Sequence, residues 1–473
     1  MIIYFINFIL LAISYLLYQI SAYKKWINNE EKEKEKEKEK EKEKENNIKN
    51  NNINKIKIGL LTNEIPPIIY GGVSTWIINF LKMFEKDTHF VVIPIFLAYA
   101  DNDKEKINII KKKHKNLRII YNQNDIDNNF KDIEICVNNL WIALDSIKYI
   151  CEKYPNMVMI SVCHSLIKME HLTNLGSCYT NNFYEQEITF QYSDYVVLIS
   201  EAEKKYYEQF GYTKYKAIPT VIYNSYKPKY DNIYFDIDYT NNTPGYIGRH
   251  VPRKRPELAL LGTLKSKKKN IHIINMGVDY DKNGNDYWKI LENKHKKILE
   301  IIPFTSDINK KNYYWRNIGV NSITGIYEPF GYTICETLDR RIPAIVQNID
   351  GPFEIIGDYK KYVYMYNVDK KNFENDIKNY SSALEKFWDT DPETRRVNAF
   401  KARKALDNFR PYVIKEKWKE LLNTCLSKDF KKKNINDSLM NNLGEKYLKI
   451  PVYTYYNKLR EFINKVFEYK NTE

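Results

Sequence analysis

The feature that most constrains the fold is a regular alternation between short apolar runs and stretches with helical spacing. The run KIKIGLLTNE, which begins at Lys55, has the composition of a buried strand, and it is followed by Gly71, Gly72 and then apolar residues at helical spacing. Further strand-like runs are HFVVIPIFLA, EICVNN, MVMISVCH and DYVVLIS, with helical stretches at residues 184–193 and 201–210. Such alternation predicts a parallel sheet with helices on both faces.

The alternation starts again near residue 241. The runs TPGYIGRH, NIHIINMG, KKILEIIPF, VNSITGIY and IPAIVQNID are each followed by loop or helix, and 473 residues are enough for two domains. We therefore predict an α/β protein with two doubly wound, Rossmann-like domains, residues 55–240 and 241–410, that face a cleft. Ligands of such sheets bind outside the carboxyl ends of the strands. Residues 411–473 are predicted to form C-terminal helices, with Trp418 on an apolar face, that partly return to the N-terminal domain.

The first residues of the chain have the composition of a membrane span. Residues 1–22 contain no charged side chain, and a helix of about 21 residues is about 32 Å long, enough for a hydrocarbon core of about 30 Å. We expect a transmembrane segment at residues 1–23, followed by a charged Glu/Lys and Asn-rich linker at 24–54. Lys24 and Lys25 follow the segment and no basic residue precedes it, which predicts a single-pass membrane protein with its body in the cytosol. A cleaved signal peptide stays open as the alternative.

Charge and cysteine usage argue against a nucleic-acid-binding function and against a structural zinc site. The net charge is +14, but the lysines are spread along the chain and no zinc-finger or RNP-type motif is present, so we expect no nucleic-acid partner. The six cysteines form no CxxC pair and lack zinc-type histidine spacing, so they are expected to be reduced and packed rather than metal ligands.

The stretch IYEPFGYTICETL places two glutamates, Glu328 and Glu336, around a Pro-Phe-Gly turn. A pair of glutamates alone is a weak signal, because the chain has 60 acidic residues. The surrounding pattern of strand, loop and helix adds weight, since it places the amides of Phe330, Gly331 and Tyr332 at a helix N-terminus. Amides there can donate to sugar or phosphate oxygens.

The segment from Glu328 to Glu336 resembles the E-x7-E motif of the retaining glycosyltransferase group 1 family, which has the GT-B fold. The stretch YIGRHVPRKRPELAL resembles the family's Gly-Arg-x4-Lys segment, with matches at Arg249 and Lys254. PPIIYGGVSTW resembles its N-terminal glycine loop, and IPAIVQNIDGPFEIIGD resembles the segment after the motif. The resemblance covers residues 56–425.

The resemblance implies a hexosyltransferase that moves a sugar from a nucleotide sugar to an acceptor hydroxyl with retention at the anomeric carbon. The donor is expected to be UDP- or GDP-linked, and neither a metal nor another cofactor is expected. The N-terminal domain is then the acceptor side and the C-terminal domain binds the nucleotide sugar. The leaving diphosphate gains negative charge, which explains why the family keeps cations there.

Individual roles follow from the same resemblance. Glu336 is expected to accept hydrogen bonds from the ribose, and Glu328 to hold hydroxyls of the donor sugar. Gly72 lets the backbone approach the diphosphate, and His164 is expected near the donor sugar. The implied catalytic residues are Glu328, Arg249, Lys254 and His164, and the implied donor-binding residues are Gly71, Gly72, Phe330, Gly331, Tyr332, Thr333 and Glu336.

Other features keep alternatives open. Asp350-Gly351 stands where the family often has Gly-Gly, so the donor pocket is expected to be narrowed or altered in charge. A phosphorylase or epimerase on the same fold would share the diphosphate groups, and a non-catalytic nucleotide- or sugar-binding protein is a further alternative. The base, the sugar and the acceptor, whether lipid, glycan or protein, are not specified by these residues.

Overall fold

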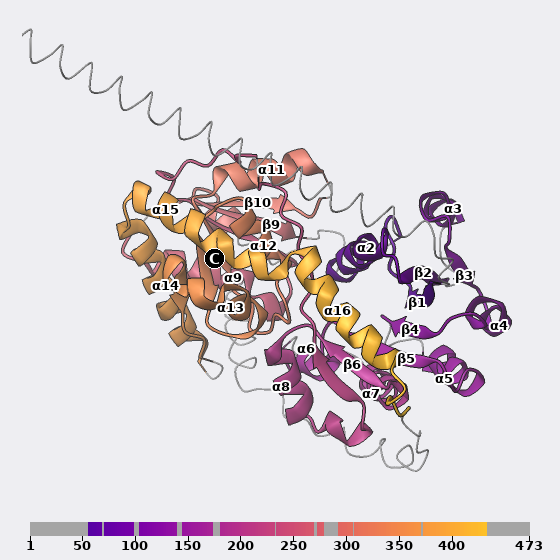
Figure 1. Ribbon diagram of the computed structural model, residues 1–473. Coiled ribbons are helices and arrows are strands. Elements are labelled where there is room, and N and C mark those ends of the chain that lie inside the picture. Colours follow the sequence, from indigo (N-terminus) through magenta and orange to yellow (C-terminus); the bar gives the residue numbers. More distant parts are fainter. Residues whose placement is uncertain are drawn as a thin grey trace, which may run out of the picture. The chain divides into compact units, whose positions relative to one another are not determined.

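The computed structural model contains two α/β domains, one after the other along the chain (Figure 1). It describes residues 55–68, 71–98, 104–139, 144–173, 180–231, 233–268, 272–278, 292–305, 307–369 and 372–432. The predicted transmembrane segment, the predicted linker and the end of the C-terminal region lie outside these residues. Within the described ranges, no helix has both the length and the apolar character that crossing a bilayer requires.

The N-terminal domain is built on a seven-stranded sheet with the order β3-β2-β1-β4-β5-β6-β7. Its strands are β1 (Ile56–Thr62), β2 (Phe90–Leu97), β3 (Arg118–Ile120), β4 (Ile135–Asn138), β5 (Val158–Cys163), β6 (Tyr195–Leu198) and β7 (Ile218–Val221). Its helices are α2 (Gly72–Phe84), α3 (Lys104–Lys113), α4 (Gln123–Phe130), α5 (Leu144–Lys153), α6 (Ile167–Thr173), α7 (Thr180–Tyr192) and α8 (Glu201–Gln209), and a 3-10 helix, η1, spans Tyr212–Tyr215.

The C-terminal domain repeats this plan on a six-stranded sheet with the order β10-β9-β8-β11-β12-β13. Its strands are β8 (Pro244–Ile247), β9 (Ile273–Val278), β10 (Leu299–Pro303), β11 (Val320–Ile323), β12 (Ala344–Gln347) and β13 (Tyr364–Tyr366). Its helices are α9 (Pro256–Lys265), α11 (Ile308–Asn317), α12 (Tyr332–Asp339), α13 (Asp350–Ile356), α14 (Phe373–Asp389), α15 (Pro392–Ala402) and α16 (Pro411–Leu426), with 3-10 helices η2 (Pro252–Lys254), η3 (Gly357–Tyr362) and η4 (Arg403–Phe409).

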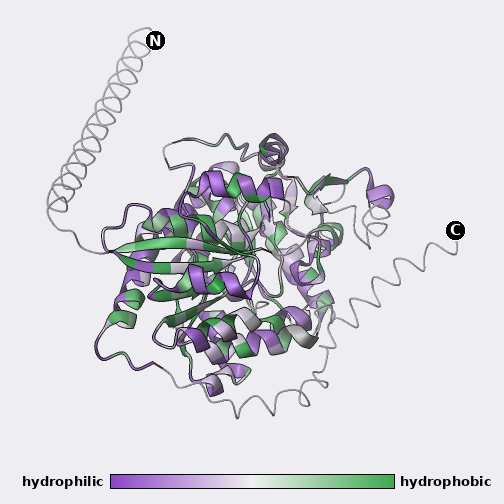
Figure 2. Cartoon of the chain, turned by 90° about the vertical axis from the view of Figure 1, so that its right-hand side faces the viewer, coloured by the Kyte–Doolittle hydropathy of each residue, from purple (hydrophilic) through white to green (hydrophobic). Residues whose placement is uncertain are grey.

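The apolar runs of the sequence became the central strands because both faces of each sheet are covered. Every residue of β4, β5 and β6 is buried, as is every residue of β11 and β12. Parallel sheets with helices on both faces have such continuous apolar strands. Figure 2 shows mainly hydrophobic strands and helices of mixed character. The predicted fold class of two Rossmann-like α/β domains is confirmed.

Each sheet reverses its strand order at one place. In the N-terminal domain this switch lies between β1 and β4, and in the C-terminal domain it lies between β8 and β11. The loops that leave the carboxyl ends of two such strands turn to opposite sides, which opens a crevice at the end of the sheet. The residues that follow these four strands are therefore the first place to look for a site.

The last described helix, α16, packs against α2 of the N-terminal domain. Trp418 of α16 is fully buried, and its ring meets that of Phe80 at 4.9 Å between centroids. Lys415 also forms an ion pair with Asp87, with 2.9 Å between Nζ and a carboxylate oxygen. The chain therefore completes the N-terminal domain only after it has built the C-terminal one.

Candidate active site

The switch point of the C-terminal sheet brings two predicted site segments together. Arg249 and Lys254 follow β8, and Glu328 follows β11. The Ile326 amide donates to the Arg253 carbonyl at 2.9 Å, and Thr324 Oγ1 donates to the Lys254 carbonyl at 2.7 Å. These bonds hold the two loops side by side.

Lys254 and Glu328 form an ion pair through Nζ and Oε2, and each side chain is only 18% exposed. Burial, together with the neighbouring cations Arg253 and Arg249, lowers the pKa of Lys254 well below its ordinary value. Three cations thus crowd one loop, and a bound anion would relieve their mutual repulsion.

Arg249 differs from the other two cations of this loop. Its side chain is exposed and has no hydrogen bond or ion pair with any described residue. Arg253, by contrast, is buried and forms an ion pair with Glu170 of α6, with 3.3 Å between a guanidinium nitrogen and a carboxylate oxygen. Lys254 is paired with Glu328. Arg249 is therefore the cation of this loop that is available to a ligand.

The N-terminus of α12 supplies free backbone donors. Gly331, which precedes the helix, has a φ of 105°, in the region that favours glycine. The amides of Gly331, Tyr332 and Thr333 have no acceptor among the described residues. Phe330 is buried beneath this turn, with its ring 5.2 Å from that of Tyr332. Free amides at a helix N-terminus attract an anion.

The predicted glycine loop lies opposite this helix end. A Cβ atom built on Gly72 would be 3.8 Å from Cδ2 of Tyr332, and one built on Gly71 would meet nothing within 4 Å. The N-termini of α2 and α12 therefore approach each other from the two domains. The open space at Gly71 leaves room for a ligand between them.

Glu336 lies on α12 and is partly buried. Its carboxylate makes no hydrogen bond with the described part of the chain. Burial raises its pKa, and the nearby charges of Arg340, Lys229 and Lys311 oppose that shift. A carboxylate with free lone pairs in such a place can accept hydrogen bonds from a ligand's hydroxyls.

Asp350 has a role that sequence reasoning did not foresee. Its φ is 58°, and its carboxylate accepts hydrogen bonds from the Glu328 amide at 3.2 Å and from the Tyr206 hydroxyl at 2.8 Å. A Cβ on the following Gly351 would be 2.4 Å from the Phe330 carbonyl oxygen. Asp350 thus fixes the position of the Glu328 loop, and Gly351 allows the close approach. The only sign of this role in the sequence was that Asp350-Gly351 stands where the family often has Gly-Gly.

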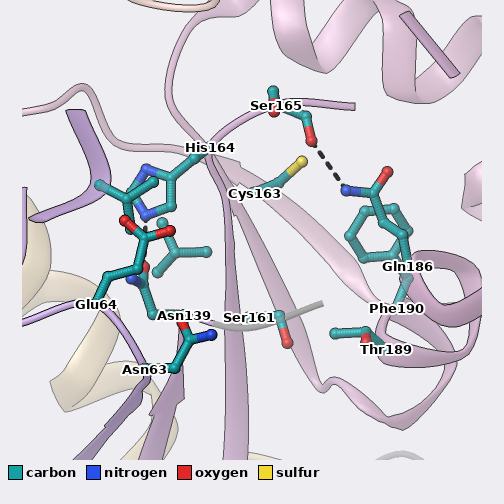
Figure 3. Close-up of a pocket in the computed structure, with 12 residues that line it drawn as sticks. Asn63, Glu64, Asn139, Ser161, Cys163, His164, Ser165, Gln186, Thr189 and Phe190 are labelled. Atoms are coloured by element: carbon teal, nitrogen blue, oxygen red, sulfur yellow. Dashed lines mark hydrogen bonds between the residues drawn. The ribbon is translucent and has the colours of Figure 1, made fainter. Parts of the chain in front are cut away.

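His164, at the end of β5, lines a pocket of the N-terminal domain (Figure 3). Burial lowers its pKa to about 3, so the ring is neutral at ordinary pH. Its Nε2 lies 2.5 Å from Oδ1 of Asn139, and its ring meets the edge of Trp76 at 5.1 Å. The pocket has a volume of about 130 Å³ and also includes Glu64. A neutral ring at this position can contribute hydrogen bonds.

A buried network joins the two domains, and sequence reasoning missed it as well. The Tyr327 hydroxyl donates to Oε1 of Glu203 at 2.5 Å and accepts from the Leu166 amide at 2.7 Å. Burial raises the pKa of Glu203 to about 8. Glu354 accepts the amides of Glu201 and Ala202 at the start of α8, at 2.9 and 2.7 Å. Tyr327 is the neighbour of Glu328, so this network bears directly on the site.

No group of three or more His, Cys, Asp or Glu side chains in the described ranges could hold a metal ion. The five described cysteines, at positions 136, 151, 163, 335 and 425, are free and buried. The described site itself presents cations, backbone amides and carboxylates.

Comparison with known proteins adds the family. Residues 235–387 match the family model of glycosyl transferases group 1. Sucrose-phosphate synthase from Thermosynechococcus elongatus aligns with a TM-score of 0.62 at 14% identity, over 79% of this chain and 99% of that one. HepE from Anabaena, solved with UDP, aligns with a TM-score of 0.58 at 15% identity, over 78% and 100%. A glycosyltransferase from Rickettsia africae gives 0.57 at 19% identity, over 79% and 100%. No curated protein matches the sequence.

Proposed function

We propose that this chain, whose residues 235–387 belong to the glycosyl transferases group 1 family and whose fold is GT-B, transfers a sugar from a nucleotide sugar to an acceptor hydroxyl. The observation that carries the proposal is the unpaired Arg249 beside the Lys254–Glu328 pair, at the switch point of the C-terminal sheet. The free amides at the start of α12 face the same ligand. Structures of HepE with UDP and with UDP-glucose support a uridine nucleotide donor.

Different residues of the proposed site bind different parts of the donor. Arg249 and the amides of α12 receive the diphosphate, and Lys254 turns from Glu328 toward it when the donor binds. One cation at about 4 Å, with an effective dielectric of about 20, is worth about 4 kcal/mol, or about a thousandfold in rate if it acts only in the transition state. The leaving group is then stabilised as its charge develops.

The carboxylates and the histidine complete the proposed assignment. Glu336 accepts the ribose hydroxyls, and Glu328 holds hydroxyls of the sugar, near the carbon that reacts. His164 is neutral, so its contribution is hydrogen bonding rather than charge. We further propose that the enzyme is a hexosyltransferase that retains the anomeric configuration and needs no metal.

A donor panel tests the proposal. The full chain is incubated with UDP- and GDP-linked hexoses in the presence of EDTA, and nucleotide release and sugar products are measured. We expect one donor to be hydrolysed slowly without acceptor and faster with one, and the anomeric proton of the product to show the donor's configuration by NMR. An inverted product would overturn retention, and activity restored only by metal would overturn metal independence.

Two alternatives make different predictions in the same panel. A phosphorylase would release sugar phosphate only when phosphate is present, and an epimerase would convert the sugar without an acceptor. A non-catalytic binding protein would raise its melting temperature with nucleotide and release no product. Any of these outcomes would contradict the proposed transfer.

We also propose that residues 1–23 anchor the protein in a membrane with the body in the cytosol. The proposal rests on the uncharged sequence of that segment and the lysines that follow it. Protease treatment of sealed vesicles tests it. A body that is protected in vesicles with the cytosolic face outside would contradict the orientation.

A further inference from the structure

The N-terminal domain has a pocket with both polar and apolar lining residues at its own switch point, where β1 and β4 end. Glu64 follows β1, Asn139 follows β4 and His164 follows β5, and all three line the pocket (Figure 3). The volume of about 130 Å³ is several times that needed for one water molecule. None of the described residues that line it is a lysine or an arginine.

Asn139 presents a buried donor that lacks an acceptor. The residue is 6% exposed, and its Nδ2 atom has no hydrogen-bond partner among the described residues. Its Oδ1 atom accepts from Nε2 of the neutral His164, which fixes the orientation of the amide. A buried donor without an acceptor is unfavourable, because it has lost its hydrogen bonds to water. This arrangement indicates a ligand that supplies the acceptor.

Glu64 presents hydrogen-bond acceptors to the same pocket. Its carboxylate accepts from the Ser74 hydroxyl at 3.5 Å, which is at the long limit for a hydrogen bond. Burial raises the pKa of Glu64, while Ser74 and the charge of Arg249 oppose that shift. Val73, which also lines the pocket, directly follows Gly72, and Gly72 faces Tyr332 of α12, so the pocket lies next to the proposed donor site.

We propose that this pocket binds an uncharged, hydroxyl-bearing part of the acceptor, with Glu64 and Asn139 as specificity-determining residues that select it over an anionic acceptor. The inference rests on the proposed glycosyl transfer. A hydroxyl group has one O–H donor and two accepting lone pairs, so hydroxyls of the acceptor can donate to Glu64 and accept from Asn139. A phosphate or carboxylate has no proton for Glu64 at neutral pH and is repelled by it.

The charges around the pocket also favour an uncharged ligand over an anionic one. Arg253 is engaged by Glu170, and Lys254 by Glu328. Arg249 has no partner among the described residues, and the diphosphate of the donor needs it. An anionic acceptor would therefore meet the carboxylate of Glu64 without a cation of its own, and like charges in contact repel each other.

The test uses the full chain with the donor that it hydrolyses and two matched acceptors, methyl glucoside and glucose 6-phosphate. Transferred product and donor hydrolysis are measured separately. We expect kcat/KM to be about tenfold or more higher for methyl glucoside, which corresponds to the cost of one poorly screened like-charge contact. Glu64→Gln should reduce this preference, because it removes the repulsion but keeps the shape.

Asn139→Asp tests the second determinant. It removes the donor, keeps the size of the side chain and the acceptor for His164, and adds a carboxylate to the pocket. We expect KM for methyl glucoside to rise about tenfold, the loss of roughly one hydrogen bond, and to rise more than KM for the donor. Glu152→Gln, an exposed change on α5, is the matched control. Melting curves check that each variant is folded.

The outcomes separate this inference from the proposed function. If the chain neither binds nor hydrolyses any nucleotide sugar, both fail together. If the donor is hydrolysed but glucose 6-phosphate is used equally or better, or neither acceptor is used, the pocket assignment alone fails. Retention of the wild-type preference by folded Glu64→Gln would also overturn it.

Discussion

Arg249 differs from the other arginines and the lysine of its loop, because its side chain has no partner among the described residues. Its neighbours in sequence form ion pairs within the protein: Arg253 pairs with Glu170, and Lys254 pairs with Glu328. Arg255 is fully buried, where it bonds the Thr324 carbonyl at 2.7 Å and forms an ion pair with Asp376 of α14. This short stretch thus contains two buried structural arginines, a lysine held by Glu328, and Arg249, which has no partner among the described residues.

Arg249→Ala should lower kcat about a thousandfold and change donor affinity much less, because the cation acts mainly on charge that develops in the transition state. Steady-state kinetics with the donor identified in the panel measures both parameters. Arg396→Ala, at an exposed ion pair on α15, is the control. Equal turnover in the two variants would contradict the role of Arg249.

Glu336→Gln should weaken nucleotide binding about ten- to hundredfold, because hydrogen bonds to a charged group are worth about 1.5–3 kcal/mol. Calorimetric titration with UDP measures the effect directly, without catalysis. The variant should lose little affinity for pyrophosphate, which lacks the ribose. A similar loss for both ligands would instead indicate that the helix end was disturbed.

The loop between β11 and α12 depends on close backbone packing with α13. Gly351 lies against the Phe330 and Pro329 carbonyl oxygens, where a Cβ would approach to 2.4 and 2.5 Å. The same contact lets the Gly351 amide donate to the Glu328 carbonyl at 3.0 Å. The geometry of Glu328 is therefore set by an element that follows it in the chain.

Gly351→Ala should destabilise the protein by about 1–3 kcal/mol, the usual cost of forcing extra volume into a packed site. Urea unfolding measures the loss. Gly211→Ala is a useful comparison, because Gly211 has a φ of 72° and a Cβ added there would meet nothing within 4 Å, so it should show backbone strain of about 1 kcal/mol without a clash. A Gly351→Ala variant as stable as the wild type would show that the α13 contact can relax.

The elements that the sequence predicted are those with strong local patterns. The central strands and the helices α7 and α8 were predicted correctly from apolar runs and helical spacing. β3, β7 and β13 were not predicted, and each is an edge strand of its sheet. Edge strands are covered less and so need no continuous apolar run; β7, for example, has no fully buried residue.

The secondary-structure positions of the candidate residues were predictable where those residues belong to a local sequence motif. Arg249, Lys254, Glu328 and Glu336 lie on the loops and the helix that the motifs indicated. The partners of these residues could not be predicted in the same way, because Asp350, Glu170 and Glu203 reach the site through contacts distant in sequence. Their roles depend on tertiary structure alone.

The contact between the two domains contains a titratable group. Glu203 is fully buried and lies near the like charges of Asp350 and Glu170, while Tyr327 and the Leu166 amide donate to it. Burial is the main reason that its pKa rises from 4.5 to about 8. The folded protein therefore holds a proton on Glu203 that the unfolded chain releases above its lower pKa.

This difference predicts that stability falls as pH rises. Between about pH 4.5 and 8 the folded state binds more protons than the unfolded state, so Glu203 alone should cost up to about 1.4 kcal/mol of unfolding free energy per pH unit. Melting temperatures of the wild type and Glu203→Gln across this range measure the effect. The glutamine variant should show a shallower decline, and parallel curves would contradict the assignment.

The return of α16 to the N-terminal domain has a consequence for engineering. Because Trp418 fills a space against Phe80 and Trp76, a chimera that joins the first half of this chain to a foreign second half would leave a hydrophobic hole. A successful exchange must transplant residues 411–426 together with the first half. The unit that can be exchanged is therefore defined by which residues pack together, and not by their order along the chain.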